Sequence, residues 1–365
     1  MKILFCAGGT FGHIAPALAA AEALKKRRPD AEILFAGREN GAEGEIARKA
    51  GFAFCGIPIQ SIERKISLRA LRAILTTAKA YGKARSLLKK ARPDLVFGTG
   101  GYVCYPFMRA AQDLKITTVL HESNATPGRA CRMLAPKCEA VLLGTRACEK
   151  SLPRNIHCHF TGNPVREEFF LYSREKARRI LGLTEEDSLL LSFGGSGGAE
   201  KLNEAILSFM ARKDKESADI YHIHAAGEKY YADIAARSPA VITKKSKKRI
   251  FPFIENMPLY MRAADLCICR SGAMTIAELA AAELPAILIP SPNVTEDHQY
   301  KNAKSLADTG GAVLLSESEL SELSDTILTI LKDKARLAEM RASLEKCAAP
   351  KAAERIAEII TKILP

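Results

Sequence analysis

The chain has 365 residues, 47% of them apolar, and a formal net charge of +13 at pH 7. This length supports two hydrophobic cores of ordinary domain size, and no apolar run reaches the roughly 18 residues that a membrane-spanning helix needs. The first apolar run stops at Gly8 and Gly9, too early for a secretory signal, and none of the ten cysteines forms a C-x-x-C pair. We therefore expect a cytosolic protein with reduced thiols.

Strands and helices are predicted to alternate along the whole chain. The predicted strands are short apolar runs at residues 2–7, 32–37, 95–100, 117–122, 140–144, 189–194, 220–226, 266–270 and 285–292. The predicted helices include residues 14–27, 68–90, 199–212 and 273–282. Such alternation indicates parallel sheets joined by crossover helices, and the strands are too many for one small sheet. We expect an α/β protein with two Rossmann-like, doubly wound parallel-sheet domains facing a cleft.

The first predicted strand leads into a glycine turn, CAGGTFGH, at residues 6–13. A helix that starts behind such a turn offers unpaired N–H groups and the positive end of its dipole to a phosphate. The turn departs from the dinucleotide pattern G-x-G-x-x-G, because Thr10 and His13 stand where that pattern needs glycines. A helix start favours a neutral imidazole, so His13 is either a general base or a histidine that only caps or packs.

Positive charge is concentrated in the first half of the chain. Residues 1–163 hold 26 Lys and Arg against 12 Asp and Glu, whereas the remainder holds 28 against 29. Residues 64–92 carry ten basic residues and no acidic one, with apolar residues at helical spacing. Tyr81 is the only aromatic residue in this stretch, so a nucleic-acid partner is not expected. An anionic membrane surface fits the stretch better, and a merely solvated helix face is the alternative.

Two further loops follow predicted strands in the first half. The turn at residues 98–101 is GTGG, and the loop HESNATPG at residues 121–128 offers His121, Glu122 and Asn124. Loops at strand ends carry function more often than other segments do. A metal site is not expected, because no D-x-D pair occurs. His157, Cys158 and His159 alternate in direction on a strand and have no second Cys or His group nearby.

The chain turns at Gly162-Asn163-Pro164 and then restarts. The sequence LSFGGSGGAEKLN at residues 191–203 repeats the strand, glycine turn and helix of the N-terminus. We therefore expect one domain at residues 1–162 and a second at residues 163–344. A last helix, from about residue 345 to 365, is expected to pack back on the first domain.

Two stretches of the second half complete the candidate site. In CRSGAMTIAELAAAELP, residues 269–285, small and hydroxylated residues precede a helix, and Glu278 follows within its first turns. Such a carboxylate holds a ribose diol or is an exposed helix residue. In IPSPNVTEDHQYKNA, residues 289–303, a strand end leads into a loop with Asp297, His298 and Gln299. These side chains are either functional or solvated.

Seven motifs occur in the order GGTFGHIAPALA, GTGGYV, HESNATPG, TGNPVR, FGGSGGAEKLN, CRSGAMTIAELAAAELPAILIP and HQYKNA, and the resemblance that they carry covers about residues 3–340. Together they resemble the MurG family of glycosyltransferases. The resemblance implies the GT-B fold and a hexosyltransferase that needs neither a metal ion nor another cofactor. The implied reaction moves GlcNAc from UDP-GlcNAc, with inversion, to the C4 hydroxyl of MurNAc in lipid I (undecaprenyl-pyrophosphoryl-MurNAc-pentapeptide). Its product is lipid II for peptidoglycan synthesis.

The resemblance also implies a peripheral position on the cytoplasmic face of the inner membrane, with cell-wall synthesis proteins as further partners. His13 is the implied catalytic base and Glu122 its reserve. The implied contacts with UDP-GlcNAc are Thr10, Phe11, Gly12, Asn124, Arg166, Ser196, Ile254, Ala273, Met274, Thr275, Glu278 and Gln299. The implied contacts with the acceptor are Gly100, Gly101 and Tyr102.

Two residues depart from the family pattern. Phe11 stands at a glycine of the family's GGTGG, where a backbone with positive φ would be strained, and Gly197 replaces the glutamine of GGSQG. Two other functions stay open. Another GT-B enzyme with a lipid acceptor, such as a diacylglycerol galactosyltransferase, would share the UDP half but would not need HESN or GTGGYV. A non-catalytic protein that binds a UDP-sugar or RNA would not explain the glycine turns, the basic stretch and His13 together.

Overall fold

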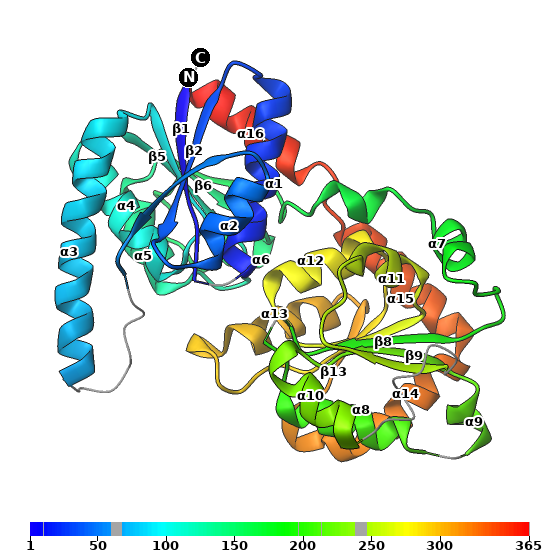
Figure 1. The fold of residues 1–365 in the computed structure, drawn as a ribbon. Helices are drawn as coiled ribbons and strands as arrows, with labels where there is room; N and C mark the ends of the chain where they lie inside the picture. Colours follow the sequence, from blue (N-terminus) through cyan, green and yellow to red (C-terminus); the bar gives the residue numbers. More distant parts are fainter. Residues whose placement is uncertain (10, 60–67, 196, 213, 238–246, 365) are drawn as a thin grey trace. The chain divides into compact units, whose positions relative to one another are not determined.

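The computed structural model describes residues 1–9, 11–59, 68–195, 197–212, 214–237 and 247–364. The chain divides into two compact units (Figure 1). The first unit contains Met1–Arg166 and Ala349–Pro365, and the second contains Glu167–Ala348. Each unit is built on one parallel sheet, so the predicted fold class is confirmed.

The first unit contains a seven-stranded sheet in the order β3-β2-β1-β4-β5-β6-β7, and every pairing is parallel. Its strands are β1 (Lys2–Cys6), β2 (Glu32–Arg38), β3 (Ala53–Ile57), β4 (Leu95–Gly98), β5 (Thr117–Glu122), β6 (Ala140–Leu143) and β7 (Cys158–Phe160). The strand order reverses between β1 and β4. In sheets of this kind ligands bind beyond the carboxyl ends of the strands at such a reversal.

Helices cover both faces of this sheet (Figure 1). One face carries α1 (Phe11–Arg27), α2 (Ala42–Lys49) and α16 (Ala352–Ile363), and the other carries α3 (Leu68–Ala91), α4 (Gly101–Asp113), α5 (Arg129–Leu134), η1 (Ala135–Lys137) and α6 (Arg146–Glu149). On the first face, Ala17 and Leu24 of α1 share a core cluster with Ile356 and Ile360 of α16. The last described helix is therefore part of the core of the first unit.

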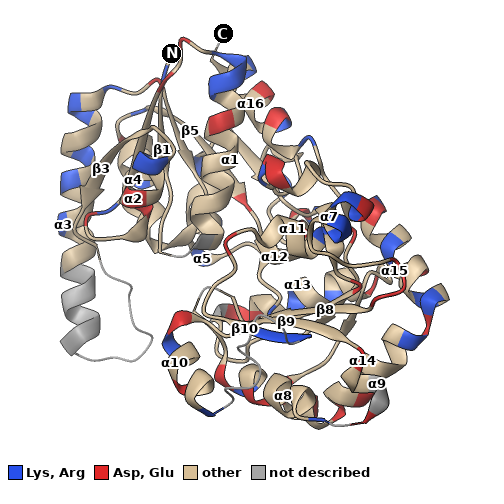
Figure 2. Cartoon of the chain, turned by 45° about the vertical axis from the view of Figure 1, so that its right-hand side comes forward, with Lys and Arg blue, Asp and Glu red and all other residues tan. Residues whose placement is uncertain are grey.

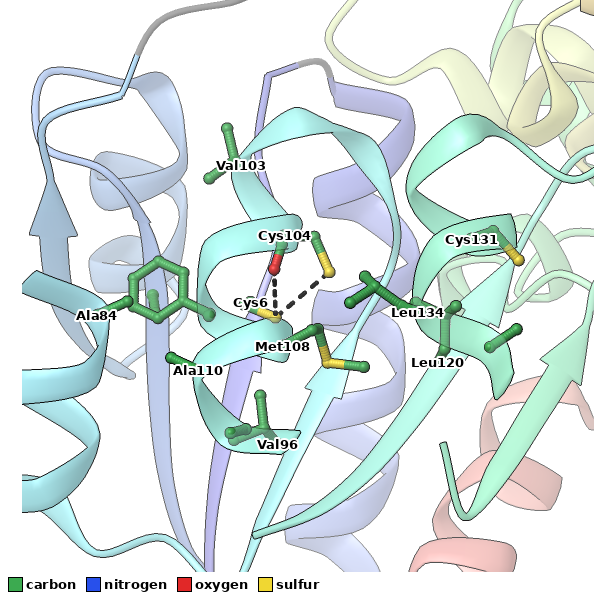
Figure 3. Close-up of a cluster of buried hydrophobic side chains, with 14 of the residues drawn as sticks. Cys6, Ala84, Val96, Val103, Cys104, Met108, Ala110, Leu120, Cys131 and Leu134 are labelled. Carbon is green, nitrogen blue, oxygen red and sulfur yellow. Dashed lines mark hydrogen bonds between the residues drawn. The ribbon is translucent and has the colours of Figure 1, made fainter. Parts of the chain in front are cut away.

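The core on the opposite face surrounds two cysteines (Figure 3). Cys6 ends β1, Cys104 lies in α4, and their Sγ atoms are 3.5 Å apart. Both side chains are fully buried, and burial raises the pKa of the Cys6 thiol well above its usual value. A Cβ at Gly98 would overlap with Cys104 Sγ, so the end of β4 needs a glycine for α4 to pack this closely. The two thiols fill space here as small apolar groups.

The second unit contains a six-stranded parallel sheet in the order β10-β9-β8-β11-β12-β13. Its strands are β8 (Leu189–Phe193), β9 (Tyr221–Ala225), β10 (Lys248–Phe251), β11 (Leu266–Cys269), β12 (Ala286–Leu288) and β13 (Ala312–Leu314). Its helices are η2 (Glu167–Phe170), α7 (Arg174–Ile180), α8 (Glu200–Met210), α9 (Lys215–Ala218), α10 (Glu228–Arg237), α11 (Met257–Ala263), α12 (Ala273–Ala281), η4 (Thr295–Asp297), α13 (His298–Ala307), η5 (Glu317–Glu322), α14 (Leu323–Lys332) and α15 (Lys334–Cys347). The strand order reverses between β8 and β11.

The sequence prediction missed β3, β10 and β13 and placed the strand at β7 one residue early, at residues 157–159; these four are the edge strands of the two sheets. Most inner strands are buried and are largely apolar, the pattern typical of parallel sheets, although the inner strand β9 contains two buried histidines. An edge strand is less buried: the residues of β7, for example, are half-buried or exposed. Edge strands therefore lack the uninterrupted apolar run on which the prediction relied.

The units separate after Arg166 and after Ala348, rather than at 162/163 and 344/345 as predicted. Residues 163–166 stay in the first unit, where Asn163 Nδ2 donates to Ser123 O at 3.0 Å, and Thr161 just before them is bonded to the same unit. The Thr161 N–H donates to Leu143 O at 3.1 Å, and the Thr161 carbonyl accepts two hydrogen bonds, of 2.9 and 2.6 Å, from Arg355 of α16. The second boundary lies later because α15 continues to Cys347.

Within the basic stretch at residues 64–92, the side chains are described from residue 76 to residue 92. Residues 64–67 lie outside the described residues, and α3 begins at Leu68. From residue 76 onward, α3 buries Ala80, Ala84 and Leu88 and exposes its lysines and arginines (Figure 2). Within the described part of the chain, no helix combines the length and the apolar character needed to cross a membrane.

Candidate functional site

Two glycine turns of the first unit meet where β1 and β4 end. A Cβ at Gly9, whose φ is +90°, would lie 2.8 Å from Tyr102 Cε1. Gly100 and Gly101 have φ of +85° and +77°, and a Cβ at Gly101 would lie 3.0 Å from His13 Cδ2. Positive φ and close approach both require glycine here. The predicted acceptor residues and the candidate base His13 are thus brought together at the strand reversal of the sheet.

His13 is the third residue of α1 and is fixed to Thr99, the residue after β4. His13 Nδ1 lies 2.9 Å from Thr99 O, and Thr99 Oγ1 donates to His13 O at 2.7 Å. A carbonyl oxygen only accepts, so Nδ1 carries the proton and Nε2 has the basic lone pair of a neutral ring. This tautomer leaves Nε2 as the atom of His13 that can take a proton from a substrate.

Glu122, the candidate reserve base, is buried at the end of β5. Its Oε1 accepts hydrogen bonds from the backbone N–H of Asn124 at 3.0 Å and from Asn124 Nδ2 at 2.9 Å. Its Oε2 accepts from the N–H of Gly128 at 2.9 Å. Three bonds within one loop mean that this carboxylate shapes the loop and orients Asn124. The geometry therefore favours a positioning role for Glu122 over that of a base.

The same loop is tied to the segment that leads to Arg166. His121 Nε2 lies 3.3 Å from Gly162 O, and Asn163 Nδ2 donates to Ser123 O at 3.0 Å. Burial lowers the pKa of His121 to about 4, so the ring is neutral and donates through Nε2. These two bonds join the loop that contains Asn124 to the motif TGNPVR, whose last residue is the half-buried Arg166.

In the second unit, the glycine turn at residues 194–198 follows β8, and Ser196 of this turn lies outside the described residues. Gly195 and Gly198 have φ of +87° and +71°. A Cβ at Gly198 would overlap with Ala226 O. Gly198 is therefore packed directly on the end of β9 before the chain enters α8.

A second helix start follows β11 at the strand reversal of this sheet. Gly272 is the N-cap of α12, and Ala273, Met274 and Thr275 form its first turn. Glu278 follows one turn later and is half-buried. The N–H groups of such a first turn have no partner within the helix and attract an anion. Four of the residues predicted to contact UDP-GlcNAc, Ala273, Met274, Thr275 and Glu278, thus lie in the first turns of one helix.

The loop after β12 is bonded to this helix start. Ser271 Oγ donates to Gln299 O at 2.8 Å, and Gln299 Oε1 accepts from the N–H of Ser291 at 2.9 Å. Glu296 and Asp297, just before α13, both have positive φ, +56° and +53°, and such backbone strain is typical of functional loops. A groove of about 350 Å³ lies beside the loop, and its lining includes Ser291 and Asp297.

The remaining predicted residues are placed as follows. Thr10 lies outside the described residues. Phe11 is the first residue of α1 and has a helical backbone. The backbone strain that the sequence analysis considered at this position is therefore absent. The side chain of Phe11 is not described. Gly12 follows in α1, and Ile254 is buried in the loop after β10. Sequence reasoning missed Thr99, although it stands in the quoted GTGG, because the bonds that tie it to His13 span 86 residues.

Comparison with known protein families gives matches for both units. The model of the glycosyltransferase family 28 N-terminal domain matches residues 3–143, and that of the family 28 C-terminal domain matches residues 189–356. These ranges include every predicted site residue except Arg166.

Curated relatives match along the whole chain. A UDP-N-acetylglucosamine–N-acetylmuramyl-(pentapeptide) pyrophosphoryl-undecaprenol N-acetylglucosamine transferase of Acetivibrio thermocellus is 40% identical and covers 100% of this chain and 98% of its own. The protein of the same name from Desulforudis audaxviator is 38% identical, with coverage of 100% and 98%. The crystal structure of Acinetobacter baumannii MurG has a TM-score of 0.77 and 27% identity, and the match covers 99% of each chain.

Proposed function

Because the chain belongs to the MurG family within glycosyltransferase family 28, we propose that it transfers N-acetylglucosamine from UDP-GlcNAc to the MurNAc of lipid I and so forms lipid II. The observation that carries this proposal is the 40% identity, along the full chain, to a transferase named for that reaction. The placement of His13, Thr99 and Gly101 at one strand reversal supports it, because this is where such sheets bind ligands.

His13 is the proposed general base. The C4 hydroxyl of MurNAc attacks C1 of GlcNAc while its proton passes to His13 Nε2, the C1–O bond to UDP breaks, and the configuration at C1 inverts. Thr99 holds the ring in the tautomer that this step needs, through the 2.9 Å hydrogen bond at Nδ1. General-base help of this kind contributes about two to four orders of magnitude in rate.

The second unit is proposed to bind the nucleotide sugar. The first turn of α12 and the glycine turn at residues 194–198 offer backbone N–H groups to the diphosphate, whose negative charge grows as UDP leaves. Glu278 is placed one helical turn further along α12 to accept hydrogen bonds from the ribose hydroxyls. Gln299 Oε1 is already bonded to Ser291, which leaves its Nε2 amide as the donor to the sugar.

The described part of α3 is proposed to contact an anionic membrane, where the acceptor's lipid tail resides. Lys79, Lys83, Arg85, Lys89 and Lys90 are all exposed, and the described half of the helix carries no acidic residue (Figure 2). A lysine or arginine close to an anionic bilayer contributes about 1 kcal/mol of binding free energy. The proposed location is therefore the cytoplasmic surface of the plasma membrane.

The deciding experiment is an assay of UDP release with purified protein, in which either UDP-GlcNAc or UDP-galactose is combined with either lipid I (or a short-chain analogue) or diacylglycerol. We expect UDP release only with UDP-GlcNAc and the lipid I acceptor, and a product with a β-linked GlcNAc. Release with UDP-galactose and diacylglycerol would instead identify a different lipid glycosyltransferase. Binding of UDP-GlcNAc without turnover in the presence of lipid I would show a non-catalytic protein.

A further inference from the structure

A buried polar network lies in the second unit, and none of its members has been assigned to the reaction. Ser192 of β8 and His222 and His224 of β9 are fully buried. His222 and His224 are two residues apart on a strand, so both point to the same face of the sheet. That face is covered by α8, whose Phe209 ring lies edge-on to His222 with 5.8 Å between the ring centroids. Asn203, in the first turns of α8, completes the network and is also buried.

The hydrogen bond from Asn203 to Ala226 shows which atom is the donor in each bond of the network. Asn203 Nδ2 donates to Ala226 O at 2.9 Å. Because a carbonyl oxygen only accepts, the amide nitrogen of Asn203 must face it, and Oδ1 then faces His224 Nε2 at 3.2 Å. His224 Nε2 therefore carries the proton, and Nδ1 of the same ring has the lone pair.

The remaining bonds follow from this assignment. Ser192 Oγ lies 2.8 Å from His224 Nδ1 and donates its single proton there. The Ser192 carbonyl oxygen lies 3.2 Å from the same nitrogen but receives no proton from it, because a neutral ring donates from one nitrogen only and Nε2 is the donor here. Ser192 Oγ accepts from His222 Nε2, also at 2.8 Å. Every donor is thus used in one direction, from His222 through Ser192, His224 and Asn203 to Ala226 O. His222 Nδ1, at the far end, has no hydrogen-bond partner among the described residues. Burial lowers the pKa of both histidines, so both are neutral, as this chain of bonds requires.

The near end of the network reaches the glycine turn at residues 194–198. Ala226 O, which accepts from Asn203, is the atom that a Cβ at Gly198 would overlap. A Cβ at Gly227 would lie 2.6 Å from Gly198 Cα. Asn203 itself donates its N–H to Ala199 O at 2.8 Å, at the start of α8. The network therefore joins the end of β9, the turn and the first turn of α8.

We propose that His224, acting through Asn203, is a positioning residue that holds Gly198, the last residue of the glycine turn, in the position needed to bind the diphosphate of the nucleotide sugar. The proposal rests on the proposed function, which assigns a diphosphate to the turn. A turn with four glycines has many accessible conformations, and each one lost on binding costs affinity. Fixing Asn203 before the ligand arrives removes part of that cost. His222, at the far end, supports the fold without touching the turn.

Four variants of the full-length protein test this assignment. His224→Leu removes the donor to Asn203, His224→Gln keeps an N–H near the position of Nε2, Asn203→Ala removes the link to Ala226, and His222→Phe alters only the far end. For each variant we would measure kcat, the KM for UDP-GlcNAc and for the lipid I analogue, the Kd for UDP by calorimetry, and the melting temperature.

For His224→Leu and Asn203→Ala, we expect the KM for UDP-GlcNAc and the Kd for UDP to rise about tenfold, the scale of one buried hydrogen bond. The KM for lipid I should stay unchanged and kcat within about threefold, because the groups proposed for proton transfer remain. His224→Gln should restore both constants to near the wild-type values. His222→Phe should lower the melting temperature and leave both constants unchanged.

The assignment is overturned if Asn203→Ala and folded His224→Leu bind UDP as the wild type does, or if His222→Phe raises the Kd as much as His224→Leu. If His224→Leu does not fold, Asn203→Ala decides the question, because an unchanged Kd for UDP in that variant would overturn the assignment. Wild-type protein that fails to transfer GlcNAc would reject the proposed function, whereas the Kd for UDP across the variants would still test the network.

Discussion

His13 Nε2 lies 3.2 Å from the point that a Cβ of residue 101 would occupy, so Gly101 provides the space beside the basic atom of the ring. Gly101→Ala would fill that space and place a side chain at a φ of +77°, a conformation that costs an L-residue about 1–2 kcal/mol. We expect transfer activity to fall at least tenfold. Gly82→Ala is the matched control, because no described atom lies within 4 Å of its added Cβ. In an exposed helix that change stabilises by about 0.5–1 kcal/mol, so normal activity is expected.

His13→Ala is expected to lower kcat by about 100-fold or more, the scale of lost general-base catalysis, while UDP still binds. Thr99→Ala is the comparison variant: it removes the hydroxyl but keeps the carbonyl that fixes the ring, so its loss in kcat should be far smaller. The two variants are compared by saturation kinetics with both substrates and by calorimetry with UDP. Near-normal turnover of His13→Ala would remove His13 from the role of base.

Glu122→Gln separates a positioning residue from a base. A glutamine has one acceptor oxygen where the carboxylate uses two, so it can satisfy Asn124 or Gly128 but not both in the same way. We expect the KM for UDP-GlcNAc to rise several-fold and the pH profile of kcat to keep its shape. If kcat of the variant instead no longer falls at low pH, where a general base becomes protonated, Glu122 is the base and the assignment of His13 fails.

The stability of the protein is expected to fall as the pH drops from about 6.5 to 4. Burial lowers the pKa of His121 and His224 from 6.5 to about 4, and it also lowers the pKa of His222. In that window the unfolded chain binds protons that the folded chain does not, so folding weakens as the solution becomes more acidic. Each such histidine contributes up to about 1.4 kcal/mol per pH unit.

Urea unfolding measured at pH 7 and pH 5 checks this expectation. His224→Gln should reduce the loss of free energy of unfolding between the two pH values, because one of the three titrating rings is gone. An unchanged difference in that variant would contradict the assignment of a depressed pKa to His224. Above pH 7 no further gain from these three residues is expected.

Binding to vesicles tests the role of α3. We expect the protein to sediment with vesicles that contain phosphatidylglycerol and to be released as salt is raised, because the charges are screened. Replacing three exposed lysines of α3 by glutamate should weaken binding by more than tenfold; these are Lys83, Lys89 and Lys90. The control makes the same change at exposed lysines of the second unit, which are Lys229, Lys334 and Lys346. Equal loss in both variants would show that net charge alone, not α3, drives binding.

The inner strands and the glycine turns were predictable from sequence because each has a local signal. A buried parallel strand is a continuous apolar run, and the turns at Gly9 and Gly101 use glycine for its positive φ. The edge strands lack a continuous apolar run, since several of their residues are half-buried or exposed. A departure from the family pattern was harder to judge. From the sequence, a strained backbone was considered at Phe11, whereas the backbone of this residue is helical.

Contacts between distant segments were not predictable. His222 and His224 alternate on a predicted strand, but their partners Ser192 and Asn203 are 30 and 21 residues away. The same holds for Thr99, whose carbonyl decides which nitrogen of His13 is basic. Sequence indicates which residue types are present at strand ends, whereas the protonation state of each ring depends on which acceptor the fold places against it.

The place of α16 has a consequence for how the protein is made. Ile356 and Ile360 complete the hydrophobic face of α1 in the first unit, yet residues 167–348, the whole of the second unit, are translated before them. Until the last helix has been translated, the core that Ala17 and Leu24 share with Ile356 and Ile360 therefore lacks the residues of α16. During that interval the growing chain presents an apolar surface to chaperones and to other nascent chains.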